Sequence, residues 1–259
     1  MKDIKIIYKV DGKEYNIQKK IPQSYDDCTY NQLVKLVKLR HKFPAVRCKL
    51  EAIRYLFELK NVQFAFIPAE LLNLLTKQLN WITDEPYLYT QQLKKVRNYI
   101  GPEGVLRDVS FLQYVYADSF ANEFTRTKNT EELYKLIATL WIEKGKRFDS
   151  KDISVRAKKI ELTWRQYQVD IAIMFFMSMK NAFVNKLYAT VFKGSGNNST
   201  AEPEEDPWFS ATRILAKDGS LGTIDDVQQE NVHTVLKTLQ EIIREDNKMR
   251  KAHDNTRSV

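Results

Sequence analysis

The start of the chain alternates between apolar and polar side chains, which is the pattern of a β-strand with one buried face. The stretch IKIIYKV is followed by Asp11 and Gly12 and then by KEYNIQKKI. Asp-Gly is a favoured pair for a tight two-residue turn between antiparallel strands. The sequence therefore predicts a β-hairpin over residues 1–22. Because an isolated hairpin is only marginally stable, we expect it to pack on the helices that follow or to pair with a strand of another chain.

From Thr29 onward the apolar residues recur at helical spacing. Thr29 and Gln32 are placed to form a capping box, in which each side chain bonds the backbone N–H of the other residue. The helix that begins there should end near Pro44. The same spacing predicts further helices over residues 45–59, 69–79, 111–124, 133–141 and 163–192. The last of these is apolar nearly all round in its middle, so we expect it to be the central helix.

Two short stretches resemble each other within the chain. Residues 27–33 read DCTYNQL and residues 161–167 read ELTWRQY, so both contain an acid, an apolar residue, Thr, an aromatic residue and Gln. Thr163 and Gln166 are therefore expected to cap the long central helix as Thr29 and Gln32 cap the first. Two independent helix starts and an internal duplication both account for this likeness. No tandem repeat accompanies it.

Residues 193–206 lack large apolar side chains and collect Gly, Ser, Asn, Pro and acidic residues, which is typical of a flexible connection. A last helix follows, with one apolar stripe at helical spacing. The predicted fold is mainly α and has four parts. They are the β-hairpin 1–22, a multi-helix core domain over 23–192, a flexible acidic linker over 193–206, and a C-terminal helical segment with a polar tail over 207–259.

The composition supports a core and limits the class of protein. Hydrophobic residues make up 43% of the chain and aromatic residues 12%, which is ample for a globular core. The longest apolar run, residues 171–177, is far shorter than the ~20 residues that cross a bilayer. The chain begins without a secretory leader pattern, and two cysteines cannot build a disulfide framework. We therefore expect an intracellular protein that does not contact a membrane.

The net charge of +8 is unevenly distributed along the chain. A basic segment over residues 144–159 is the best candidate for binding polyanions, because several cations in a short stretch can release counterions from DNA or RNA. Its cations are Lys144, Lys146, Arg147, Lys151, Arg156, Lys158 and Lys159. A solvated helix face and loop explains the same charges, and the segment lacks the interleaved aromatic residues that stack on single strands.

Residues with catalytic or metal-binding spacing are not apparent in the sequence. His41, His233 and His253 lie far apart, and none belongs to a metal-binding motif such as HExxH. No nucleophile motif or phosphate-binding loop occurs. The carboxylate pairs, such as Asp26 with Asp27, lie at helix starts, where acids stabilise the helix dipole, or in the linker. The sequence therefore predicts a protein that is not an enzyme and that holds no cofactor or metal.

Two segments resemble proteins of tailed phages and prophages. Residues 22–33, PQSYDDCTYNQL, are similar to a phrase in small structural or assembly proteins of this class. Residues 208–239 resemble the C-terminal part of tail-assembly chaperone-like proteins, in which a tryptophan-led short helix, a glycine-containing turn and an Asp-Val helix entry precede an amphipathic helix. The two segments cover about a fifth of the chain, and the long middle carries no resemblance.

The resemblance implies a non-enzymatic protein that binds tail components during assembly, in the host cytoplasm or on the virion. The apolar area for a partner would come from Trp208, Phe209, Val232, Val235, Leu236, Leu239, Ile242 and Ile243. The same residues are also suited to packing back on the helical domain. In the first case, deletion of residues 207–259 leaves a folded remainder that no longer binds its partner. A nucleic-acid-binding protein that uses residues 144–159 is the alternative function.

Overall fold

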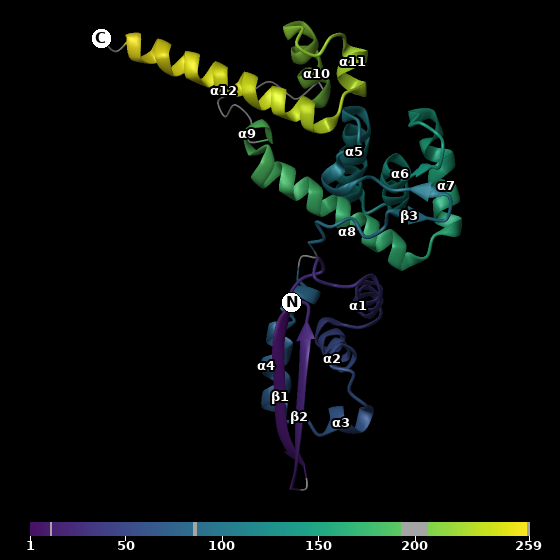
Figure 1. The fold of residues 1–259 in the computed structure, drawn as a ribbon. Helices are drawn as coiled ribbons and strands as arrows, with labels where there is room; N and C mark the ends of the chain where they lie inside the picture. The colour runs from purple at the N-terminus through teal and green to yellow at the C-terminus, as the bar shows by residue number, and fades with distance from the viewer. Residues whose placement is uncertain (11, 85–86, 193–206, 258–259) are drawn as a thin grey trace. The chain divides into compact units, whose positions relative to one another are not determined.

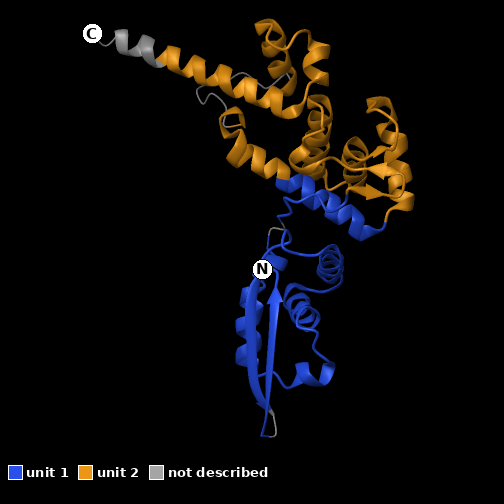
Figure 2. Ribbon diagram, viewed as in Figure 1, with its two compact units in different colours: residues 1–93, 165–178 blue, residues 94–164, 179–259 orange. Residues whose placement is uncertain are grey.

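The chain is predominantly helical in the computed structural model, which describes residues 1–10, 12–84, 87–192 and 207–257 (Figure 1). A mainly α fold with an N-terminal β-hairpin is therefore confirmed. The chain forms two compact units, which are coloured separately in Figure 2. The first unit contains residues 1–93 and 165–178, and the second contains residues 94–164 and 179–259.

These units divide the chain differently from the four segments that we expected. Residues 23–192 are divided between the two units, because the chain leaves the first unit after Leu93 and returns to it at Arg165. Helix α8 (Gln166–Ala182) belongs to the first unit as far as Ser178 and to the second beyond it. The expected linker 193–206 lies outside the described residues. The segment after it belongs to the same unit as residues 94–164.

The predicted hairpin is present in the first unit. Strand β1 (Lys2–Val10) pairs antiparallel with β2 (Lys13–Ile21), and Val10 faces Lys13 across the turn. Gly12 has φ of 76°, a left-handed conformation that glycine adopts without steric cost. Asp11 lies outside the described residues. One face of the hairpin is buried, through Ile4, Ile6, Tyr8 and Ile21.

Helices of the first unit begin where capping residues predict them. Its elements after the hairpin are α1 (Tyr30–Lys42), α2 (Ala45–Leu56), α3 (Asn61–Ala65), α4 (Ala69–Gln78) and the 3₁₀ turn η1 (Asn80–Ile82). The capping box of Thr29 and Gln32 forms, with N···O distances of 3.3 and 2.9 Å. Pro44 and Pro68 directly precede α2 and α4, where the missing proline N–H leaves no helical bond unmade.

The second unit contains the remaining elements. They are β3 (Lys95–Val96), β4 (Tyr99–Ile100), η2 (Gly104–Leu106), α5 (Phe111–Thr127), α6 (Thr130–Leu140), β5 (Ile142–Glu143), η3 (Ser150–Asp152), α7 (Ile153–Thr163), the π-helical turn η4 (Phe183–Leu187), α9 (Ala189–Phe192), α10 (Pro207–Asp218), α11 (Ile224–Gln229) and α12 (Val232–Arg257). Helix α6 packs against α5 and α7, and β4 pairs with both β3 and β5. The two-residue strands are too short for alternation to reveal them in the sequence.

The single helix predicted over residues 163–192 is wrong. Helix α7 ends at Thr163, whose hydroxyl donates to the Lys159 carbonyl inside the helix and so does not cap a new one. Helix α8 begins at Gln166 instead, and the Arg165 N–H donates to Gln168 Oε1 over 2.9 Å. Side chain to backbone bonding within a helix competes with capping for threonine hydroxyls, so the pair of residue types alone does not fix the helix start.

Most of the polar tail that we expected at the end of the chain belongs to helix α12. The helix continues to Arg257, and an ion pair of 2.9 Å joins Asp246 and Arg250 one turn apart. Such a pair stabilises a solvated helix by about 0.3–0.5 kcal/mol. Among the described residues, none of the helices has both the length and the hydropathy needed to cross a bilayer.

Candidate protein-binding surfaces

The apolar stripe of α12, which we predicted as a partner-binding surface, is largely covered by the second unit itself. The helix packs against α5, α9 and α10. Ile242 and Ile243 continue the stripe and are half-buried. Four side chains nearer the start of the helix are buried, namely Val232, Val235, Leu236 and Leu239. In this fold the stripe therefore forms part of the core.

Hydrogen bonds fix the start of α12 to the loop before α5. Two backbone N–H···O bonds of 2.8 and 3.1 Å join residues 109–111 to residues 230–232. The Asn231 side-chain amide donates to the Arg107 carbonyl over 2.6 Å, although 124 positions separate the two residues. Asn231 Oδ1 also accepts from the His233 N–H over 2.9 Å, as an N-cap side chain does. The register of α12 on the unit is therefore determined by polar contacts as well as by apolar burial.

The His233 ring has a structural role at the same place. Its Nε2 lies 2.6 Å from the Val105 carbonyl oxygen, which can only accept, so Nε2 carries the proton. Nδ1 is hydrogen-bonded to the Tyr188 hydroxyl over 2.7 Å. Val105 has φ of 61°, which is a rare conformation for a β-branched residue. The hydrogen bond from His233 Nε2 to the Val105 carbonyl holds this strained backbone in place.

Trp208, the second part of the predicted partner-binding set, also packs within the unit. Its ring makes edge contacts with Phe111, Tyr114 and Phe192 at centroid distances of 5.6, 5.7 and 5.5 Å. The indole N–H donates to Asp118 Oδ2 over 3.2 Å. Buried Asp118 is in turn paired with the Lys180 ammonium at 2.7 Å. Trp208 thus anchors the start of α10 on α5.

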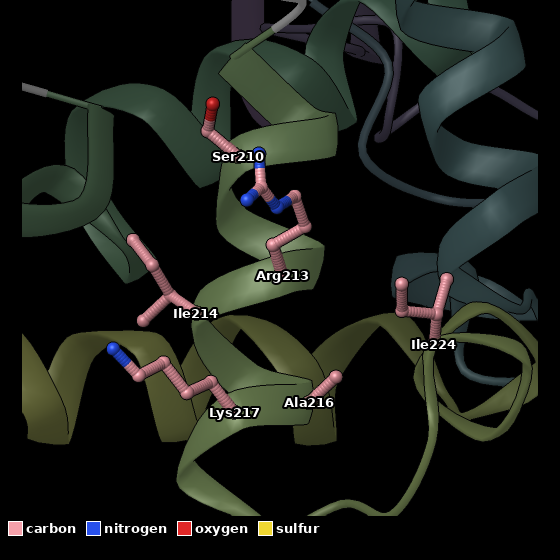
Figure 3. A pocket seen from close by; sticks show the side chains of 6 residues that line it. All are labelled: Ser210, Arg213, Ile214, Ala216, Lys217 and Ile224. Carbon is pink, nitrogen blue, oxygen red and sulfur yellow. The ribbon is translucent and has the colours of Figure 1, made fainter.

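The opposite face of α10 is open. Thr212 and Leu215 turn inward and are buried, whereas Phe209 and Ile214 are 47% and 52% exposed. Ile224, at the start of α11, is 39% exposed. Figure 3 shows the side chains of Arg213, Ile214 and Lys217 extending from α10, and that of Ile224 from α11, around a surface hollow of about 560 Å³. We call Phe209, Arg213, Ile214, Lys217 and Ile224 the α10–α11 face.

The position of α11 beside this face depends on a local turn. Asp226 accepts from the Thr223 N–H at 2.9 Å, and the Asp226 N–H donates to the Thr223 hydroxyl at 3.3 Å. The Thr223 hydroxyl donates to Asp226 Oδ2 over 2.7 Å, and this bond, together with that from the Thr223 N–H, lowers the pKa of the Asp226 carboxyl. Gly222 precedes the cap with φ of 83°, and a Cβ atom there would lie 2.6 Å from Asp226 Oδ2. Only glycine therefore fits without moving the cap.

Comparison with known protein families, curated proteins and solved structures found no match. The α10–α11 face is a candidate docking surface, because exposed large apolar side chains lie next to exposed cations there.

The basic segment 144–159 is only partly available to a polyanion. Lys146 and Lys159 both pair with Glu143, at 2.8 and 3.4 Å, and these contacts lower the pKa of that carboxyl. Arg156 is buried and donates to the Ala138 carbonyl over 2.5 Å. Four exposed cations remain without an ion pair among the described residues, namely Lys144, Arg147, Lys151 and Lys158.

Sequence reasoning missed two exposed aliphatic residues on α7, one within the basic segment and one just beyond it. Val155 and Leu162 are 59% and 84% exposed on α7, on the side opposite to buried Ile153 and Ile160. A helical projection of residues 153–163 contains the signal, since Val155 and Leu162 are seven positions apart and fall on one face. The polyanion prediction rests on the charges of the segment and does not indicate these two residues.

Among the described residues, no group of three or more His, Cys, Asp and Glu residues is placed to hold a metal ion. Cys28 and Cys48 are buried, and burial raises the pKa of the Cys28 thiol to about 12, so its reactive thiolate is scarce. His41 lies 4.0 Å from Asp170, whose pKa is raised by burial.

The segment 22–33, which carries part of the phage resemblance, has a structural role. The buried Tyr25 hydroxyl donates to the Ile82 carbonyl over 2.8 Å. The Asp26 carboxylate accepts from the backbone N–H groups of Tyr89 and Thr90, at 3.1 and 2.6 Å. Asp27 accepts from the Gln23 N–H and pairs with the amino group of residue 1. The acidic pair therefore holds backbone segments together.

Proposed function

We propose that this protein is a non-enzymatic assembly or structural protein of the tailed-phage type, which binds protein partners such as tail components. The observation that carries the proposal is the α10–α11 face, where exposed Ile214 and Ile224 line a hollow together with Arg213 and Lys217. Exposed Phe209 lies beside it, with its ring 5.9 Å from the Arg213 guanidinium. The tailed-phage part of the proposal rests on the sequence resemblance of residues 22–33 and 208–239. In this proposal the partner binds the outer side of α10 and the start of α11, whereas the inner side of α10 packs on α5 and α12.

The energetics indicate what the partner must provide. Covering a large aliphatic or aromatic side chain fully contributes about 1.5–3 kcal/mol, so half-exposed Phe209, Ile214 and Ile224 contribute roughly 1 kcal/mol each. Micromolar affinity corresponds to about 8 kcal/mol. The three side chains alone do not reach that value, and the partner must also place acidic groups near Arg213 and Lys217.

A paired substitution on this face tests the proposal. The tagged chain is purified without nuclease from the cells or particles that contain it naturally, as wild type and as Ile214→Asp with Ile224→Asp. We expect stoichiometric structural or tail-type proteins with the wild type, and a loss of more than about tenfold in the variant, because two buried carboxylates replace apolar anchors. Quantitative mass spectrometry and the 260/280 nm absorbance ratio measure both outcomes.

Leu74→Asp provides the matched control. Leu74 lies on α4 in the first unit and is 57% exposed, close to the 52% of Ile214. This variant should retain the same partners as the wild type. Retention of the partners by the double variant contradicts the proposal. Recovery of nucleic acid alone, released by moderate salt, contradicts it as well and supports the nucleic-acid-binding alternative through Lys144, Arg147, Lys151 and Lys158.

A further inference from the structure

The outer face of α7 carries a mixed basic and aliphatic stripe. Lys151, Val155, Lys158 and Leu162 follow one another at intervals of four, three and four residues, so they lie along one side of the helix and the 3₁₀ turn before it. All four side chains are exposed. Leu162, at 84% exposure, is more open than Ile214 or Phe209 of the α10–α11 face. We call these four residues the α7 stripe.

Charge on the stripe is of one sign. The ammonium groups of Lys151 and Lys158 have no ion pair among the described residues, whereas the neighbouring Lys159 is paired with Glu143. Two acids near the stripe, Asp152 at the end of η3 and Glu161 on α7, fall to either side of it on a helical projection. A ligand on this face therefore meets two positive charges that the fold does not neutralise.

We propose that the α7 stripe binds an acidic amphipathic helix of a protein partner. Lys151 and Lys158 are seven positions apart, so two carboxylates one or two helical turns apart on the facing helix meet both cations. Val155 and Leu162 lie beside the cations and receive aliphatic side chains of the same partner helix. The surface is distinct from the α10–α11 face, and it adds a second partner site of stated chemistry to the proposed function.

A protein partner fits these residues better than a nucleic acid does. Phosphates would use the two lysines but leave Leu162 and Val155 in water, and the α7 stripe offers no aromatic ring on which a base can stack. An acidic amphipathic helix uses both the cations and the aliphatic side chains.

The test is photo-cross-linking with the full-length chain in the cells that contain it. Photoreactive benzoylphenylalanine replaces exposed Val155, and a matched reporter replaces Leu74 on α4. We expect cross-links from position 155 to protein segments with Asp or Glu at helical spacing. Lys151→Glu with Lys158→Glu should reduce them more than about tenfold, and the milder pair Lys151→Gln with Lys158→Gln should reduce them less. Leu162→Asp should reduce them as well.

Each contrary result overturns the inference. Cross-links to nucleic acid, cross-links to segments without acids, a yield no higher than that from position 74, or a yield insensitive to the lysine variants would each do so. Circular dichroism of every variant confirms that the fold is retained. The double variant Ile214→Asp with Ile224→Asp separates this inference from the proposed function. It should leave the cross-links from position 155 unchanged while abolishing the partners of the α10–α11 face.

Discussion

The stripe of α12 and the stripe of α7 have similar spacing in the sequence, but the first is buried and the second is exposed. In α12 aliphatic residues recur three and four positions apart on one side of the helix, and in the α7 stripe aliphatic residues and lysines together keep the same intervals. Val232 to Leu239 are buried against neighbouring helices, whereas Val155 and Leu162 remain exposed. In α12 the stripe is uninterrupted by charge, and in α7 lysines alternate with the aliphatic residues.

The difference shows what distinguishes a core stripe from a docking stripe. Burying a lysine without a partner charge is costly, so a stripe that alternates cations with aliphatic residues cannot enter the core of its own chain. It can still meet a surface that supplies the opposite charge. Hydrogen bonds from residues 105–111 fix α12 where its purely apolar stripe is covered.

The largest expected effect separates the two stripes by stability. Leu236→Ala removes a fully buried side chain from α12, and we expect it to lower the free energy of unfolding by about 2–5 kcal/mol. Leu162→Ala makes the same change on the exposed stripe and should alter it by less than about 0.5 kcal/mol. Urea unfolding followed by circular dichroism measures both. Equal effects would contradict the assignment of α12 to the core.

Deletion of residues 207–259 removes the whole buried stripe of α12, together with Trp208. Because α12 and Trp208 cover α5, the remainder should expose apolar surface and lose the cooperative unfolding of the second unit. The hypothesis that the α12 stripe binds a partner predicted a folded remainder. Because the chain itself covers this stripe, we no longer expect the remainder to fold. A shortened chain that is monomeric, cooperative and as stable as the full one would restore that earlier hypothesis.

A smaller effect tests the polar contacts at the start of α12. Asn231→Ala removes the bond to the Arg107 carbonyl and the N-cap bond to the His233 N–H. We expect a loss of about 1–2 kcal/mol, which is the usual cost of a lost cap and an unmade hydrogen bond. Thr234→Ala, at an exposed position on the same helix, is the control. A variant as stable as the control would leave apolar burial as the sole determinant of the α12 position.

The smallest effect concerns pH and the cations beside the α7 stripe. Lys146 and Lys159 lower the pKa of Glu143 from its ordinary value of 4.5, so this contact stabilises the fold above that pH and loses its contribution as the pH falls through the lowered pKa. Glu143→Gln should therefore cost up to about 1 kcal/mol at neutral pH and nothing measurable near pH 2. Urea unfolding at both pH values gives the comparison. A cost that does not depend on pH would argue against the ion pairs.

Local signals in the sequence were sufficient for much of the fold. The hairpin and the capping box of Thr29 depend on residues within a few positions of one another, and both are present. The matching pair Thr163 and Gln166 misled the prediction because Thr163 bonds back to Lys159 within α7. The division into two units was not predicted. The first unit combines residues 1–93 with residues 165–178, and no local sequence pattern indicates contacts between segments so far apart.

The candidate surfaces were harder to predict for the same reason. Arg156 counted as one of seven cations available to a polyanion, yet it is buried against the Ala138 carbonyl, eighteen positions away. Trp208 was identified as a partner anchor, and its indole binds Asp118, 90 positions earlier. Phe209 was predicted as a partner-binding residue and is exposed. Ile214 and Ile224 were missed, because tertiary packing of the opposite side of α10 decides which of its faces is open.

Hydrogen exchange, measured on the chain alone and bound to its co-purified partner, tests the central claim most directly. Amides of α12 between residues 232 and 243 should already exchange slowly in the free chain and change little on binding, because the chain itself covers them. Amides over residues 207–224 should become slower on binding. New protection confined to α12, with residues 207–224 unchanged, would contradict the account and return the partner site to the α12 stripe.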